Sequence, residues 1–352
     1  MTKEPNKTPK RRGARIALIV LAVLAAIALT LGCVAYALYW HGRSSLLGHG
    51  GDIDTPESLV DSADEDGQTV TYQGADYAYN KNVVSLLFIG VDKSDINHDA
   101  VYGKNGQADS LFLAALDTKT GAVKILPISR ETMAEVNVYA SDGAYIGVQK
   151  LQLCLAYAYA ATPEEGCENV CRSVQRLLYN IPIDGYVAID LAGVKALNNA
   201  VGGVRVTSPE DLTFRHSPTD VTRIEKGQTI TLNDKTVISY IQHRGDDVNA
   251  NNRRMQRQQQ FLNEFIRVAA NNVKKNFTLL EKYYSIAKPY AVSDLTLSKI
   301  TYLASTYLVG GRIAPNYIPV TGNTVMGEQY VEFYPDEAVL YEAVLAAFYT
   351  KV

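Results

Sequence analysis

Residues 83–91 read VVSLLFIGV, an apolar run rich in β-branched side chains, and Asp92 follows it directly. An unbroken apolar run of this length is typical of a strand buried on both faces of a sheet. Similar runs and several stretches of helical spacing alternate after it. The strand-like runs are at residues 111–116, 123–128 and 186–189, and the helical ones at 150–160, 165–178, 191–200 and 252–273. Interleaved strands and helices predict an α/β protein, with a mixed central sheet between two layers of helices.

The composition is that of a folded protein. The chain has 352 residues, of which 47% are hydrophobic and 20% charged. These values exclude disordered, collagen-like and disulfide-knot classes. No linker interrupts the pattern after residue 82, so residues 82–352 are predicted to form one domain that includes the strands and helices of its last 70 or so positions.

An apolar segment precedes this domain. Ile16 to Trp40 contains no Asp, Glu, Lys or Arg over 25 positions, enough for a helix to cross a bilayer core of about 30 Å. Residues 1–15 carry six basic residues and one acid, which predicts a cytoplasmic tail. A cleaved signal peptide is the alternative, but its apolar stretch is usually shorter. We therefore expect a signal-anchor over 16–40, a single-pass plasma-membrane protein and an extracellular domain.

The segment over residues 41–81 is acidic. Residues 44–80 contain no Lys or Arg but eight acids, so 41–81 is predicted to be an extracellular stalk. Without the tail's six basic residues and one acid, 28 basic and 36 acidic residues remain, a net charge of −8. This charge disfavours generic nucleic-acid binding, which needs a basic face.

Three cysteines lie in the predicted extracellular part, where disulfides are permitted. If residues 150–160 and 165–178 form a helical hairpin, Cys154 lies opposite Cys171, with Cys167 as the second choice. We therefore expect a disulfide between Cys154 and Cys171, or else between Cys154 and Cys167. The spacing is a poor zinc signature.

Two carboxylates stand at predicted strand ends. Asp92 follows the first strand, and Asp109 precedes the second. Hard oxygen ligands of this kind suit Mg²⁺, with Mn²⁺ as a possible substitute, and Mg²⁺ typically takes one or two carboxylates plus phosphate oxygens. Ordinary strand-end aspartates in turns are the alternative.

Cationic side chains follow. Arg130 closes the third strand, and a cluster lies further on, comprising Arg244, Arg253, Arg254, Arg257 and Gln258. Arg254 and Gln258 are four apart, as are Arg253 and Arg257, so each pair shares a helix face. Guanidinium groups bind phosphate bidentately, which predicts an anion site. A solvated face paired with Asp246 and Asp247 is the alternative.

Six motifs together resemble the LytR-CpsA-Psr (LCP) family of membrane-anchored bacterial phosphotransferases. They are LLFIGVD (86–92), ADS (108–110), ISRET (128–132), YNIPIDGY (179–186), VGGV (201–204) and RMQRQQQ (254–260). The resemblance covers about residues 82–273. It implies a central sheet between helices that encloses an apolar pocket for a polyprenyl chain.

The resemblance also implies the site. It makes Asp92 and Asp109 the carboxylates around Mg²⁺, and the pyrophosphate-binding groups Arg130, Arg244, Arg254 and Gln258. Many relatives have Arg where this chain has Gln107 and Gln242. Arg253, Arg257 or Lys150 could then substitute for the two missing guanidinium groups.

The implied activity is transfer of a glycopolymer, such as teichoic acid or capsule, from a polyprenyl pyrophosphate carrier to a peptidoglycan hydroxyl. Asp92 and Asp109 are the candidates for the general base. Two other functions stay open: a non-catalytic receptor or regulator for a polyprenyl lipid or glycan, favoured by Gln107 and Gln242, and a lipid pyrophosphatase that uses water as acceptor.

Overall fold

The computed structural model describes residues 33, 36–47, 51–96, 101–245, 247, 249–276, 278–307 and 315–352. The predicted tail (1–15) and most of the predicted anchor (16–40) lie outside these residues. Within the described part of the chain, no helix is both long and apolar enough to span a bilayer. The last residues of the predicted anchor belong to a helix over residues 36–46.

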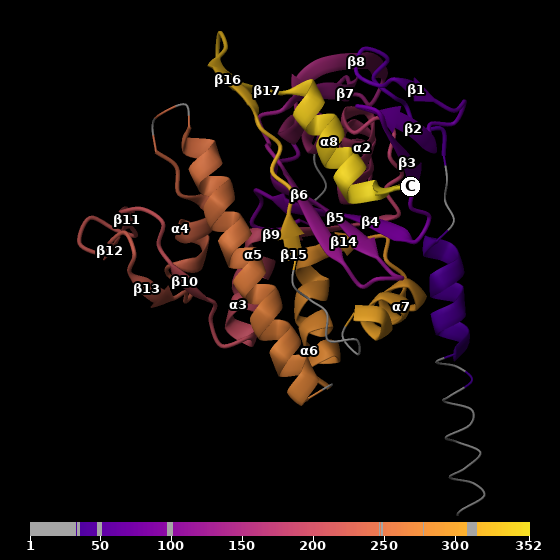
Figure 1. Ribbon diagram of the computed structural model, residues 1–352. Coiled ribbons are helices and arrows are strands. Elements are labelled where there is room, and N and C mark those ends of the chain that lie inside the picture. The colour runs from indigo at the N-terminus through magenta and orange to yellow at the C-terminus, as the bar shows by residue number, and fades with distance from the viewer. Residues whose placement is uncertain are drawn as a thin grey trace, which may run out of the picture.

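A six-stranded mixed sheet forms the centre of the molecule (Figure 1). Its order is β14 (Ala291–Ser293), β9 (Gly185–Asp190), β4 (Val83–Val91), β5 (Ala108–Asp117), β6 (Val123–Ile128) and β15 (Pro315–Tyr317). β4 runs parallel to β9 and antiparallel to β5, while β15 is parallel to β6. The predicted α/β class and mixed sheet are confirmed, and the quoted run at 83–91 is the strand β4.

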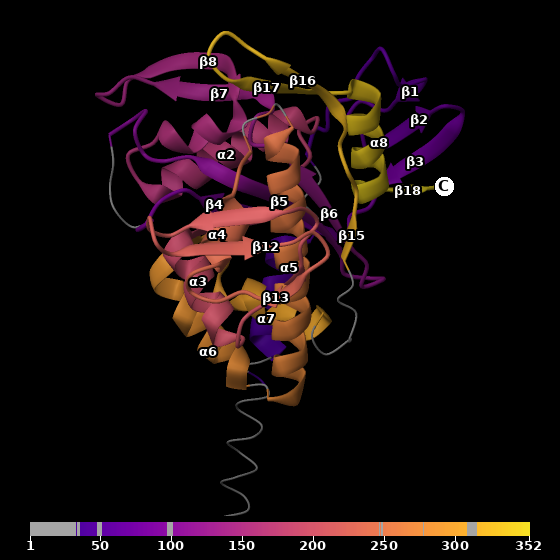
Figure 2. The same ribbon diagram turned by 90° about the vertical axis from the view of Figure 1, so that its left-hand side faces the viewer.

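The two faces of the sheet differ in what covers them. Leu87, Ile89 and Leu113 belong to the main core, which α2 (Pro163–Leu177) and α8 (Glu337–Phe348) also build. Phe88 and Phe112, paired across β4 and β5, point to the opposite face. That face is covered by α3 (Leu191–Ala200), α5 (Ala250–Lys275), α6 (Thr278–Ala287) and α7 (Leu297–Tyr307). Figure 2 shows α3, α6 and α7 below the sheet and α2 above it, while the long α5 runs past the sheet from top to bottom.

Local sequence explains where these helices begin. Thr162 and Glu165 form a capping box around Pro163 at the start of α2. The Asp190 side chain accepts from the N–H of Gly193 and caps α3, so β9 passes directly into that helix. These caps fix the residue at which each helix begins.

A second hydrophobic cluster lies beside the sheet, built by α3, α4 (Val237–Gln242), the C-terminal half of α5, α6 and four short strands. The strands are β10 (Arg205–Thr207), β11 (Leu212–Arg215), β12 (Val221–Ile224) and β13 (Thr229–Thr231). Two further hairpins lie at the opposite end, β7 (Met133–Tyr139) with β8 (Tyr145–Gln152) and β16 (Gly322–Met326) with β17 (Val331–Pro335).

The predicted stalk over 41–81 is wrong. Its second half forms β1 (Ser62–Ala63), β2 (Thr69–Tyr72) and β3 (Ala75–Tyr79), which pair with the C-terminal β18 (Tyr349–Lys351). Val70 and Tyr72 are buried in the main core. The alternation of polar and apolar residues in Thr-Val-Thr-Tyr therefore predicts this segment better than its acidic composition does. The folded domain begins well before residue 82.

The helix predicted over 150–160 is also wrong. Residues up to Gln152 belong to β8, and only Leu153–Ala158 is helical, as the short 3₁₀ helix η1. The hairpin that was to align Cys154 with Cys171 or Cys167 does not exist, and all three thiols are free. Cys154 instead contacts Arg130.

Candidate functional site

Three side chains from distant parts of the chain meet at the ends of β5 and β6. Asp109 on β5 accepts from Arg130, which follows β6, and from the Nη1 of Arg254 on α5 at 3.1 Å. Arg254 is 1% exposed and Arg130 9%. Burial lowers the pKa of Arg254 to about 10 even though Asp109 opposes that shift, and the neighbouring Arg244 and Arg130 lower it further. Two guanidinium groups thus share one carboxylate, which leaves a net positive charge.

Neutral groups hold the two guanidinium groups in place. The Nη2 of Arg130 donates to the Gln107 side chain and lies 3.1 Å from the Cys154 sulfur. The Nη2 of Arg254 donates to Asn251 at 2.6 Å. The Nε of each guanidinium is buried with no acceptor among the described residues. Buried donors without a partner are rare, so this pair of arginines is suited to an anion that the protein does not supply.

Asp92, Gln107 and Gln242 lie at the same edge of the sheet. The Asp92 Oδ1 accepts from the Gln242 side chain at 3.0 Å, and the Asp92 N–H donates to the Gln107 carbonyl at 3.0 Å. Asp92 is exposed, whereas Gln258 is buried and bridges Ser110 to the Ile241 carbonyl. Asp92, Gln107 and Gln242 are therefore joined in one chain of hydrogen bonds.

Arg244 and Glu131 complete the charged groups near Asp109. Arg244 is exposed and forms no ion pair with a residue that the structure describes. Glu131 is 8% exposed. Burial raises the pKa of Glu131, while the positive charges of Arg244, Arg130 and Arg254 oppose the shift. Arg244 is thus the cation of this group that is open to solvent.

Three other predicted residues do not join the Asp109 cluster. Arg257 is 1% exposed and binds Glu210 and the carbonyls of Tyr240 and His243. Arg253 pairs with Asp247 and with Glu210. Lys150 lies on β8 with its Nζ 5.4 Å from the Tyr334 ring centre. These contacts make Arg253 and Arg257 structural groups that tie α5 to neighbouring segments.

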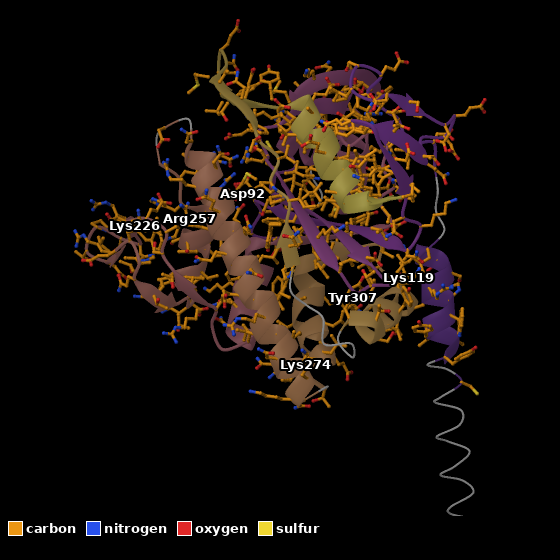
Figure 3. All side chains as sticks on the ribbon, viewed as in Figure 1. Asp92, Lys119, Lys226, Arg257, Lys274 and Tyr307 are labelled. Atoms are coloured by element: carbon orange, nitrogen blue, oxygen red, sulfur yellow. The ribbon has the colours of Figure 1, made fainter. Side chains whose placement is uncertain are left out.

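An apolar cavity of about 500 Å³ adjoins the cluster. Asp109, Ser110, Gln242 and Gln258 line its polar end, and Phe88, Phe112 and side chains of α3, α5 and α7 line the rest. Phe88 is 36% exposed although β4 is a central strand. Tyr307 lines the cavity too, and Figure 3 shows it well below Asp92. A large aromatic side chain facing open space in a sheet centre indicates room for an apolar ligand.

The two predicted metal ligands fit Mg²⁺ by their chemistry. No group of three or more His, Cys, Asp or Glu side chains suited to a metal occurs in the described ranges. Mg²⁺, however, needs only one or two carboxylates when phosphate and water supply the rest. The Asp92 Oδ2 accepts no hydrogen bond from the residues described, and each Asp109 oxygen keeps a lone pair beside its guanidinium partner.

Several residues of the site were missed from sequence. Asn251 joins Arg254 to Ser129, Glu131 lies among the guanidinium groups, and Cys154 contacts Arg130. Asn251 is three positions before Arg254 on α5, so its place on that face of the helix was a usable signal. Cys154 had no such signal, because its approach depends on the fold of β8 and η1.

Comparison with known proteins identifies the relatives of this chain. A model of the LytR_cpsA_psr family matches residues 53–342. The Bacillus subtilis protein named polyisoprenyl-teichoic acid–peptidoglycan teichoic acid transferase TagV is 31% identical over 57% of this chain and 48% of its own length. The TagU protein of the same activity name from Bacillus licheniformis is 24% identical over 85% of this chain and 84% of its length. The crystal structure of B. subtilis TagV is similar, with a TM-score of 0.60 and 26% identity, over 76% of this chain and 96% of that one.

Proposed function

Because this chain belongs to the LytR-CpsA-Psr family, we propose that it transfers a glycopolymer from a polyprenyl pyrophosphate carrier to peptidoglycan. The names of the TagV and TagU relatives support both the glycopolymer, teichoic acid in their case, and the acceptor. This chain spans about half the length of the TagV relative, so the activity rests also on its own site.

The observation that carries the proposal is the junction of the apolar cavity with the guanidinium cluster. The cavity accepts an isoprenoid chain, because its walls are apolar side chains of the sheet and of α5 and α7. Asp109 and Gln258 mark the polar end, where Arg130 and Arg254 hold positive charge. A lipid with a diphosphate head matches both parts at once.

In the proposed reaction, a peptidoglycan sugar hydroxyl attacks the sugar-linked phosphorus. The bond from that phosphorus to the bridging oxygen breaks, and polyprenyl phosphate leaves with that oxygen. Negative charge grows on the leaving phosphate, so Arg130 and Arg254, already positioned by Asp109, stabilise the transition state. Arg244 is exposed and unpaired among the described residues, so it can reach the phosphate groups from the solvent side.

The attacking hydroxyl must lose a proton. Both oxygens of Asp109 already accept from guanidinium groups, whereas the Asp92 Oδ2 is open. We therefore assign Asp92 as the acceptor of this proton.

Asp92 and Asp109 would also hold Mg²⁺ or Mn²⁺, through the lone pairs that remain on oxygens already accepting a hydrogen bond, so that the Asp92 Oδ2 stays available for the proton. The ion would supply further positive charge to the diphosphate. Gln242 orients Asp92 for this role through its 3.0 Å hydrogen bond.

The same proposal places the protein in the plasma membrane. The uncharged segment from Ile16 to Trp40 would form the anchor, and the basic residues before it would keep the N-terminus cytoplasmic. The transfer site would then face the peptidoglycan.

A single assay tests the activity. The full chain is incubated with a polyprenyl pyrophosphate-linked glycopolymer, with and without peptidoglycan, and both released polyprenyl phosphate and wall-bound polymer are measured. A transferase releases the lipid only when it attaches the polymer. Release without attachment would indicate a pyrophosphatase. Chelation should stop transfer, and added Mg²⁺ or Mn²⁺ should restore it; transfer that survives chelation would contradict the metal.

A receptor is the second candidate, and Gln107 and Gln242 favour it. Each stands where many relatives have Arg, and each is engaged with a site residue, Arg130 or Asp92. A receptor would bind the lipid in the cavity and release nothing in this assay.

A further inference from the structure

A second cavity, of about 370 Å³, lies on the other side of α7 from the apolar one. Its walls come from the helix over residues 36–46, the C-terminal half of α7, and two turns at the ends of β4 and β5. Tyr39, Arg43, Tyr302 and Lys119 are among the lining residues. Figure 3 shows Lys119 beside α7 and close to the helix over residues 36–46.

The walls of this cavity are tightly packed together. The rings of Tyr39 and Tyr302 meet edge to face at 5.2 Å. A Cβ on Gly42 would come within 2.0 Å of the Ser298 carbonyl oxygen, so the helix and α7 are in backbone contact there. Leu46 is 1% exposed and packs against Val84. The cavity is therefore preformed by the fold.

The charge of the cavity favours an anion. Arg43 and Lys119 both line it, and neither forms an ion pair with a residue that the structure describes. Asp117, in the same turn as Lys119, accepts from the N–H groups of Lys119 and Thr120 at 2.9 Å and from Asn80 at 3.0 Å. The C-terminal end of α7 adds about half a negative charge, less than the two full positive ones.

The position of the cavity along the chain indicates which anion. The uncharged run ends at Trp40, and Tyr36 and Trp40 are 66% and 45% exposed. Trp and Tyr of this kind gather at the boundary between lipid tails and head groups. Arg43 follows one helical turn later, about 4.5 Å further along the axis. That is the level of the lipid phosphates.

We propose that this cavity binds the phosphate of an anionic phospholipid from the outer leaflet, through Arg43 and Lys119. The site is distinct from the transfer site, but it rests on the proposed membrane anchor. α7 forms a wall of both cavities, since Leu303 and Tyr307 line the apolar one and Tyr302 lines this one. The head group thus fixes the helix that borders the carrier cavity and sets the orientation of the domain on the membrane.

Trp40 provides the readout, because it is the one tryptophan of the chain and Arg43 lies 5.3 Å from its ring centre. The full chain is placed in nanodiscs of phosphatidylcholine with increasing phosphatidylglycerol, and Trp40 emission is recorded. We expect a saturable shift for the wild type. Lys119→Gln should need about fivefold more phosphatidylglycerol for the same shift. Lys226→Gln, an exposed lysine on the far side of the molecule (Figure 3), should behave as the wild type.

Three outcomes would overturn the proposal. The wild type could show no saturable shift, or Lys226→Gln could weaken it as much as Lys119→Gln, which would indicate general surface charge. In a further arm, inorganic phosphate is added to pure phosphatidylcholine nanodiscs; an equal shift there would make the site one for a soluble anion. A chain that does not enter nanodiscs at all would instead contradict the proposed anchor. None of these arms depends on glycopolymer transfer.

Discussion

Arg254 and Asp109 are 145 positions apart in the sequence, yet the Nη1 of Arg254 lies 3.1 Å from the Asp109 Oδ2 in a place where the arginine is 1% exposed. A buried cation of this kind depends on its partner, because the Arg254 guanidinium itself is shielded from water while the Asp109 side chain is 13% exposed. In the proposed reaction this pair links stability to activity, because the contact that joins α5 to the sheet is also the one that would position charge for a diphosphate.

The first prediction concerns this pair. Arg254→Gln leaves Asp109 with one guanidinium partner, so we expect the free energy of unfolding to fall by about 3–5 kcal/mol, as for other broken buried ion pairs. In the Arg254→Gln background, Asp109→Asn should lower the free energy of unfolding by much less than it does in the wild-type background. Denaturant unfolding of the full chain, followed by circular dichroism, measures all four proteins. Additive losses would contradict the coupling.

The solvated helix face that was the alternative interpretation of these arginines does not describe Arg254. Its side chain is buried, so its removal would disturb the fold, whereas Arg244 is exposed. The clean test of catalysis therefore moves to Arg244.

The second prediction uses Arg244→Gln. Arg244 has no ion-pair partner among the described residues, so its loss should lower the unfolding free energy only by the modest amount that its charge contributes to the buried Glu131 carboxylate. If it contacts the phosphates in the transition state, kcat for polyprenyl phosphate release should fall by about 10²-fold or more. Arg223→Gln, at an exposed arginine on β12, is the matched control and should retain full activity. Equal activity in both variants would remove Arg244 from the mechanism.

The third prediction tests the cavity with two adjacent alanines. Ala114 lines the cavity, whereas Ala115 faces the main core on the other side of β5. Ala114→Phe should therefore fill the space and abolish binding of polyprenyl phosphate with little effect on stability. Ala115→Phe should overpack the core and lower the unfolding free energy by about 1–3 kcal/mol. Binding that survives Ala114→Phe would place the lipid elsewhere.

Much of the fold could be predicted because its information is local. The runs at 83–91, 111–116 and 123–128 are strands β4, β5 and β6, and the helical spacing at 252–273 lies within α5. Apolar periodicity over such lengths decides the type of element whatever the surroundings.

The errors come from nonlocal contacts. β3 is ordered by pairing with β18 from the other end of the chain, so acidic composition misled the prediction of a stalk. Arg257 is one turn from Arg254 on α5, but it forms an ion pair with Glu210 and does not join the Asp109 cluster. The sequence spacing places a residue on a helix face; it does not say which partner that face meets.

The last prediction concerns pH. Burial raises the pKa of Glu131 above its usual value, and Arg244, Arg130 and Arg254 counteract only part of the shift. The folded state therefore binds this proton more tightly than the unfolded state. The resulting stability is present below the ordinary glutamate pKa of about 4.3 and is lost as the pH rises through the folded value.

Glu131→Gln should then raise the Tm at pH 7, because it removes a carboxyl whose ionisation the fold disfavours, and the gain should vanish in acid, where this carboxyl is protonated in both the folded and the unfolded state. Thermal unfolding at a series of pH values measures this difference, with the exposed Glu135→Gln on β7 as the control. A gain that is the same at every pH would mean that the substitution acts through packing. In an Arg244→Gln background the buried carboxylate has one fewer positive neighbour, so its pKa is raised further. The gain from Glu131→Gln should then keep growing to a higher pH and be larger at pH 7.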